Sequence, residues 1–358
     1  MTALDFASNA AVRPTWRWWV FVALSVVVLA GLPLVTDVSL QLQLSLIFLL
    51  SLLALSMSFM WGYGGMLSFG QTVFYGLGGY CYAIASMNFG TTGWAMLIAV
   101  LLPAVVAALL GYFMIYGRLS DIYLSVITLA VTLIFEKAIR ATSGPEFVVG
   151  SVRLNGQNGI PGVPGLQVPW QDAPLSMEGV FWLTAAAMVT VYVALRLLLT
   201  TSYGRVLVGI RENEARMQLM GFDSRRYKLA AFVVSGAIAG LSGALYAVWG
   251  NFVAPEMFNL NQAAQVVIWV IVGGRSTLIG PIVGTGVVQW LTTWLGQVGV
   301  GQVTLVLGFV LMVFVLAFRE GLLPTLGALG RVLVRRQPGD TAPPVLPARQ
   351  SAPGAPRE

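Results

Sequence analysis

The sequence SYGRVLVGIRENEARMQLMGFDSRRYK, residues 202–228, is the one long charged segment of this chain. Apolar stretches long enough to span a bilayer lie on both sides of it. A charged segment between two spans must lie in water at a membrane face, and an excess of Arg favours the cytoplasmic face. The pattern predicts a cytoplasmic elbow, residues 201–228. Six of the chain's 20 Lys and Arg residues lie in it: Arg205, Arg211, Arg216, Arg225, Arg226 and Lys228.

The composition is that of an integral membrane protein. Hydrophobic residues make up 57% of the chain and charged residues only 9%, with a mean hydropathy of +0.82. A soluble domain carries about 25% charged residues. The net charge of +6 is explained by Arg residues between spans and in the tail, so we expect no nucleic-acid partner.

Several kinds of chemistry are excluded by residues that the chain lacks. Its two lysines, Lys137 and Lys228, do not follow a glycine-rich loop, so the phosphate-binding P-loop is absent. There is no histidine, and Cys81 is the one cysteine, which excludes a zinc cluster and an internal disulfide. We therefore expect a chain that is not an enzyme and has no catalytic residue, metal site or cofactor of its own.

The apolar stretches predict an all-α, polytopic fold with about ten transmembrane helices. They cover approximately residues 18–35, 40–61, 62–88, 93–116, 121–140, 179–200, 229–250, 263–272, 278–295 and 303–318. The arm 263–272 is short for a full crossing, which needs about 20 residues, so 263–295 could instead be a re-entrant pair. Asp121 is a candidate cap for the helix that follows it.

Segments outside the spans complete the predicted organisation. Residues 1–17 form a cytoplasmic N-terminal segment, and 18–320 form the transmembrane domain. Residues 141–178 are rich in Gly and Pro and predict a periplasmic loop. Residues 331–358 predict a disordered cytoplasmic tail, because they are rich in Pro and Ala. Both termini are then cytoplasmic.

Glycines recur through residues 62–79 and predict a helix that breaks at membrane depth. Such a break is tolerated only where protein covers it or where it lines a wet cavity. Pore lining and packing are equally compatible with the polar side chains there. The candidate translocation path consists of Ser68, Gln71, Thr72, Tyr75 and, further along the chain, Gln265. For Gly236 and Gly240, small residues four apart, helix packing is the favoured interpretation.

Ionisable residues are nearly absent from the predicted spans. Glu136, Lys137 and Arg140 lie at the outer end of one span, and Glu136 and Lys137 are expected to form an interfacial pair there or simply to extend to the membrane surface. With no mid-membrane carboxylate, energy for any transport is expected to come from another protein. In the elbow, a short surface helix ending at Gly221 could present apolar side chains to a groove in that partner. Ser125, Thr128 and Thr132 share one helical face and are expected to bond to their own helix carbonyls.

Four motifs now allow a resemblance to be stated. Residues 204–247, GRVLVGIRENEARMQLMGFDSRRYKLAAFVVSGAIAGLSGALYA, resemble the coupling loop and next span of inner-membrane permeases in branched-chain amino-acid ABC importers. The motifs WGYGGMLSFGQTVFYGLGGY, NGQNGIPGVPGL and VIWVIVGGRSTLIGPIVG are also similar to such permeases. In this order they cover most of residues 45–320.

The resemblance implies a multi-pass permease subunit of the bacterial inner membrane that works by alternating access. Its implied partners are a second homologous permease, two cytoplasmic ATPases that bind ATP and magnesium, a periplasmic solute-binding protein and membrane lipid. The residues that match the ATPase-docking loop are Arg211, Glu212, Glu214, Ala215, Gly221 and Phe222.

The identity of the solute stays open at this stage. Ser276 stands where many relatives have glycine, and the VGGR form with Arg275 is also similar to urea-type permeases. Branched-chain or other hydrophobic amino acids are the first candidates for the transported solute, and urea or short amides are the alternative. From another class, a stand-alone secondary carrier or channel would transport without any ATPase.

Overall fold

The computed structural model describes residues 16–117, 119–167, 174–297, 308, 309, 312, 314 and 321–325. Helices make up most of this part of the chain, which confirms the all-α, polytopic class. The expected span 303–318 lies almost wholly outside the described residues. Residues 1–15, 168–173 and the tail 331–358 also lie outside them.

Nine helices of 14 residues or more lie in the described part of the chain. They are α2 (Trp16–Gly31), α3 (Val38–Ser58), α4 (Gln71–Phe89), α5 (Thr92–Tyr116), α6 (Asp121–Ala141), α7 (Met177–Thr200), α10 (Ser224–Gly250), α11 (Leu260–Gly273) and α12 (Ile279–Gln297). Five segments are long and apolar enough to cross a membrane by themselves: Val38–Tyr63, α5, α6, α7 and α10.

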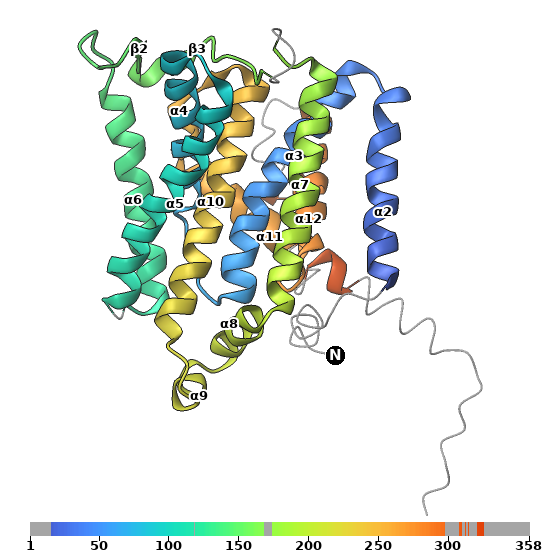
Figure 1. Cartoon of the computed structure of the whole chain (residues 1–358), viewed down its shortest axis with the longest axis vertical. Coiled ribbons are helices and arrows are strands. Elements are labelled where there is room, and N and C mark those ends of the chain that lie inside the picture. Colours follow the sequence, from blue (N-terminus) through green and yellow to red (C-terminus); the bar gives the residue numbers. More distant parts are fainter. Residues whose placement is uncertain are drawn as a thin grey trace, which may run out of the picture.

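The two ends of the helical bundle differ in what they carry (Figure 1). The elbow folds into α8 (Ser202–Glu212) and α9 (Glu214–Leu219), which lie at the same end as the start of α2. The short strands between α6 and α7 lie at the opposite end. We call these the elbow end and the loop end. This arrangement matches the predicted separation of the charged tract from the Gly- and Pro-rich loop.

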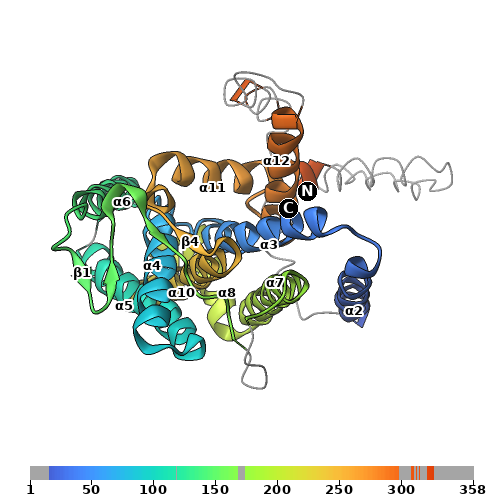
Figure 2. The same cartoon turned by 90° about the horizontal axis from the view of Figure 1, so that it is seen from above.

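The centre of the bundle is formed by α3, α4 and α10, with the other helices around them (Figure 2). The most apolar 18-residue windows of α3 and α10 are 78% and 72% buried, whereas those of α5, α6 and α7 are 33% buried or less. The outer helices expose large apolar side chains such as Leu101, Val105 and Phe113, as expected of surfaces that face lipid.

Glycines allow α4 and α10 to approach closely. A Cβ atom at Gly78 would overlap the backbone of Gly240, and one at Gly243 would overlap the carbonyl oxygen of Tyr75. Small residues at a helix crossing are how membrane helices gain contact without a hydrophobic driving force. Gly236 and Gly240 are both buried on α10 beside neighbouring helices, which agrees with their packing interpretation.

The predicted break is present between α3 and α4. After Ser58 the helix widens into one π-helical turn, η2 (Phe59–Tyr63), and residues 64–70 are not helical. Helix α4 then begins at Gln71. We call residues 64–70 the break. Ten to twelve residues on either side of it are almost entirely buried, so protein covers it, as a membrane requires.

The loop end contains short strands that the sequence did not predict. β1 (Val148–Val149) pairs with β2 (Val152–Arg153), and β3 (Ile160–Pro161) pairs with the distant β4 (Phe252–Val253). Near the base of this loop, Arg140 contacts Glu136 at 3.0 Å and Glu256 at 3.1 Å. The interfacial pair expected between Glu136 and Lys137 is formed instead by Glu136 and Arg140, which lie one helical turn apart.

The inward arm before α12 is built in two pieces. A 3-10 turn, η4 (Pro255–Phe258), packs its Phe258 ring against α4 at Gly76, and α11 then continues for 14 residues. In Figure 2, α11 is seen lengthwise, so it is strongly tilted. The turn after it reaches the elbow end, where the backbone of Arg275 contacts Gly62. This path favours two crossings over a re-entrant pair.

We predict that Gly243→Ala destabilises the protein, because the added methyl group would push α4 away from α10. Overpacking of this kind costs about 1–3 kcal/mol. Thermal unfolding in detergent should show a lower Tm. Gly250→Ala, on the same helix but with open space around the added Cβ, is the matched control. Equal Tm values for the two variants would contradict the close packing.

Candidate functional site

Helix α8 forms the first half of the elbow. The Thr201 hydroxyl accepts a hydrogen bond from Gly204 N and so caps the helix. Val206, Leu207 and Ile210 are buried on one face, which holds α8 against the bundle. The helix ends at Glu212 because Asn213 is extended, with φ −157°.

Helix α9 is a separate element, although the sequence predicted a single short helix. The side chain of Asn213 accepts a hydrogen bond from Arg216 N at 2.9 Å and starts the second helix. The helix ends two residues before Gly221, whose φ of +88° is suited to glycine. This confirms Gly221 as the helix stop. No residue of α9 is buried.

The outer surface of the elbow carries exposed apolar side chains among charged and polar ones. Leu219 is 90% exposed, Met220 is 61% exposed and Phe222 is 37% exposed. Exposed apolar side chains that lie together at a helix end make this surface a candidate for contact with a partner. Of the predicted docking residues, Glu212, Ala215, Gly221 and Phe222 are exposed.

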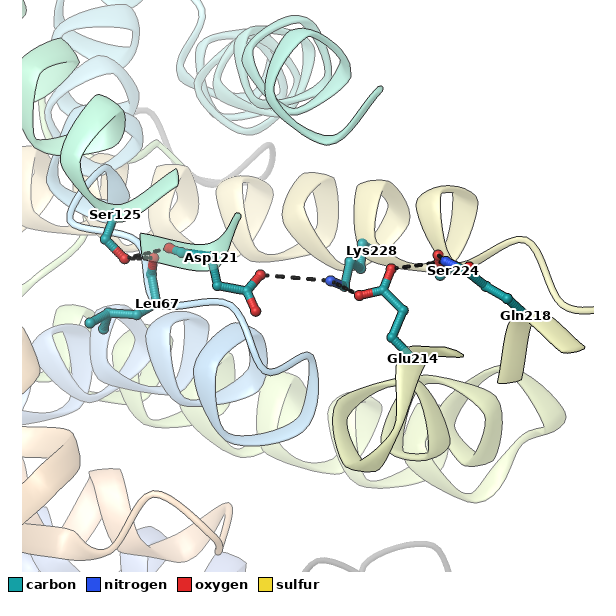
Figure 3. Close-up of polar contacts among 7 residues, drawn as sticks. All are labelled: Leu67, Asp121, Ser125, Glu214, Gln218, Ser224 and Lys228. Atoms are coloured by element: carbon teal, nitrogen blue, oxygen red, sulfur yellow. Dashed lines mark hydrogen bonds and ion pairs between the residues drawn. The ribbon is translucent and has the colours of Figure 1, made fainter. Parts of the chain in front are cut away.

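Glu214, in contrast, is turned toward the bundle (Figure 3). Its carboxylate lies 2.7 Å from the Lys228 ammonium, which in turn lies 3.6 Å from Asp121. Burial by itself raises the pKa of Glu214, but hydrogen bonds from Lys228 and Ser224 outweigh it and leave the pKa below its usual value. Lys228 thus joins α9, α10 and α6 through one ammonium group.

Arg211 is also turned inward. Its guanidinium donates to the carbonyl oxygen of Gly62 in η2 and lies 3.9 Å from Glu212. Burial lowers the pKa of Arg211, and the nearby Arg275 adds to this effect, while Glu212 opposes it. The elbow therefore contacts the helix end that leads into the break.

Three hydroxyl groups of α6 bind the backbone of the break. Ser125 donates to Leu67 O at 2.8 Å, and Thr132 donates to Phe69 O at 3.1 Å. Thr128 accepts from Phe69 N at 3.1 Å. The expected bonds to α6 carbonyls are present too. The sequence shows that the three hydroxyls share one helical face. It does not show that they bind the backbone of the break, which is distant in sequence.

The sequence also missed the role of Asp121. It was a candidate helix cap, but Ser120 occupies the cap position and Asp121 is the first residue of α6. There its carboxylate is free to pair with Lys228. Neither Asp121 nor Lys228 was singled out for this pairing, because 107 positions of sequence, from 121 to 228, separate them.

Four of the five candidate path residues are buried within the described part of the chain. Ser68, Gln71, Thr72 and Tyr75 are all at most 2% exposed. Gln71 accepts from Ser56 Oγ at 3.2 Å, and Thr72 donates to Phe69 O at 3.3 Å. Gln265 lies on α11 with an exposed side chain. A role in the path stays a prediction for all five. Within the described residues, no group of three or more metal-binding side chains is present.

Comparison with known proteins gives a family match. Residues 40–316 match the profile of a family described as branched-chain amino acid transport system / permease component. No solved structure matches the chain significantly.

Individual relatives agree with the family match. The chain is 29% identical over 247 residues to the high-affinity branched-chain amino acid transport system permease protein LivM of Escherichia coli. That match covers 63% of this chain and 56% of the relative. LivM of Salmonella typhimurium is 28% identical with the same coverage. A probable LivM of Methanocaldococcus jannaschii is 22% identical over 192 residues, 53% of each chain. The match thus spans only about half of each relative's length.

We predict that Thr128→Val weakens the break, because Phe69 N would lose its acceptor in a partly buried setting. An unsatisfied buried donor costs about 1–3 kcal/mol. Thermal unfolding in detergent measures the loss. Thr184→Val is the matched control, since Thr184 is equally buried and bonds only within its own helix. A similar loss in both variants would contradict a special role for Thr128.

The lowered pKa of Glu214 predicts a pH-dependent contribution to stability. That contribution is complete above the ordinary carboxyl pKa and is lost as the pH falls through the lowered pKa of the folded state. The difference in Tm between the wild type and Glu214→Gln should therefore be largest near about pH 7 and shrink below about pH 4. Solvent screening limits it to about 1 kcal/mol. A difference that grows on acidification would contradict the pairing.

Proposed function

Because this chain belongs to the family of branched-chain amino acid transport system permease components, we propose that it is the membrane-spanning subunit of an ATP-driven importer. The observation that carries this proposal is the elbow, which joins an exposed apolar surface to inward contacts with the bundle. The chain is proposed to act in the bacterial inner membrane with its elbow and both termini in the cytoplasm.

The proposed partners follow from this role. Two ATPases bind ATP and magnesium and dock on the elbow, a second homologous permease completes the passage, and a periplasmic protein delivers the solute. Glu212, Ala215, Gly221 and Phe222 are exposed and would lie toward the ATPase. Arg211 and Glu214 contact the bundle and would pass the motion inward. Nucleotide binding then drives alternating access.

The proposed solutes are branched-chain or other hydrophobic amino acids. The described ion pairs lie at helix ends, at Arg140 on one side and at Arg211, Arg226 and Lys228 on the other. A passage without fixed charge suits a solute of no net charge, because neither an anion nor a cation would find a partner there.

The test is uptake of radiolabelled leucine into vesicles that contain the assembled importer. The binding protein is supplied on the side from which leucine is taken up, and ATP is supplied on the side of the ATPases. We predict uptake that requires ATP and all subunits. Leu219→Asp, which places a charge on the docking surface, should reduce ATPase retention and uptake at least about tenfold, the equivalent of about 1.4 kcal/mol.

Val35→Asp is the matched control, because Val35 is similarly exposed, at 88%, but belongs to the connection between α2 and α3, which lies at the loop end (Figure 1). It should leave uptake unchanged. Leucine-independent uptake of urea would contradict the proposed solute. Uptake by the chain alone, driven by an ion gradient, would contradict the importer and indicate a secondary carrier or channel.

A further inference from the structure

Lys228 occupies a bridging position between two elements that flank a cleft. The cleft has a volume of about 520 Å³, and its lining includes Asp121 of α6, Glu214 of α9 and Lys228 of α10. The Lys228 side chain is only 13% exposed, whereas those of Glu214 and Asp121 are 40% and 58% exposed. A single shielded ammonium thus holds two carboxylates from different helices (Figure 3).

Neighbouring cations at the start of α10 are engaged elsewhere. Arg226 pairs with Asp223 at 3.1 Å, and the guanidinium of Arg225 lies 5.9 Å from the centre of the Tyr116 ring. Within the described residues, Lys228 is therefore the cation that forms ion pairs with both α9, at Glu214, and α6, at Asp121. Without its charge, Glu214 and Asp121 would face each other across the cleft and repel.

The contacts continue from Asp121 to the break. Ser125, one turn further along α6, donates both to Asp121 O and to Leu67 O, and Figure 3 shows this contact next to the Lys228 bridge. Thr128 and Thr132 hold Phe69 in the next turns. Helix α6 therefore connects an ion pair at its first residue to the backbone of the break through hydrogen bonds at successive turns.

A second contact holds the other end of the same segment. Arg211 of α8 donates to Gly62 O, and the Gly65 backbone lies against its side chain. The break is therefore held by α8 before it begins and by α6 along its length. If α9 moves with α8 held in place, the Lys228 bridge is a direct contact through which α9 can displace α6 and, with it, the break that α6 binds.

We propose that Lys228 is a positioning residue, which transmits displacement of α9 through Asp121 and α6 to the break at residues 64–70. This inference rests on the proposed function. Docking and transmission then belong to different residues. The outward surface of the elbow binds the ATPase, whereas Lys228 passes the motion of the bound ATPase to the broken helix.

The first experiment measures coupling in the assembled importer. Lys228→Met keeps a long unbranched side chain without its charge, and Lys228→Arg restores the charge. Lys137→Met, at the chain's other lysine, which is exposed at the loop end of α6, is the matched control. Subunit assembly, ATP hydrolysis and leucine uptake are measured separately in vesicles.

We expect Lys228→Met to lower uptake per ATP hydrolysed about tenfold, within the usual range of coupling between sites. Assembly and basal ATP hydrolysis should stay at the wild-type level, and Lys228→Arg should recover most of the uptake. The proposal is overturned if Lys228→Met keeps the wild-type ratio, or if assembly, hydrolysis and uptake fall in equal proportion, which a purely structural tie would produce.

The second experiment needs no ATPase, so it separates this inference from the proposed function. Hydrogen exchange of the purified full chain in detergent reports on α9 and on the break, whose Phe69 amide is bonded to Thr128. Lys228→Met should raise exchange about tenfold in both segments, because both depend on one bridge. Lys228→Arg and Lys137→Met should exchange like the wild type. Faster exchange confined to α9 would overturn the proposal even if the importer transports leucine.

Discussion

A helix that breaks inside a membrane must have its freed backbone groups satisfied by neighbouring protein, and the rest of this structure depends on that constraint. The break after η2 exposes backbone groups of Leu67 and Phe69, and hydroxyls of α6 bind them. These bonds fix α6 beside the break. They also tie an outer helix to the centre of the bundle, although only 22% of its most apolar window is buried.

Close packing of the central helices sets where the elbow can act. Helix α4 begins at the end of the break and crosses α10 where Gly78 meets Gly240 and Tyr75 meets Gly243. Helix α10 starts within the last residues of the elbow and carries Lys228 in its second turn. The glycines therefore bring a water-facing ion pair and a membrane-buried break into one packed unit. A few hydrogen bonds and ion pairs thus link the surface of the chain to its interior.

Much of this organisation could be predicted from local patterns. The glycine run from residue 62 predicted a broken helix, and the arginine-rich tract predicted an elbow that ends a helix at Gly221. The division of the elbow at Asn213 was missed, because one residue that is both an extended linker and a cap leaves little trace in composition. The strands β3 and β4 were missed because each has two residues and its partner is distant in sequence.

The sequence by itself determined that the chain is a bundle of membrane helices with a charged elbow at one face. The length of an apolar stretch, the spacing of glycines and the charge are properties of short segments. They can therefore be read from the sequence without knowing which segments are in contact. Only the tertiary structure decided which residues of different segments are in contact. It paired Lys228 with Asp121, joined Arg211 to Gly62 and turned the hydroxyls of α6 toward the break. Hydrogen bonds and ion pairs act over a few ångströms, so the packing of distant helices chooses their partners.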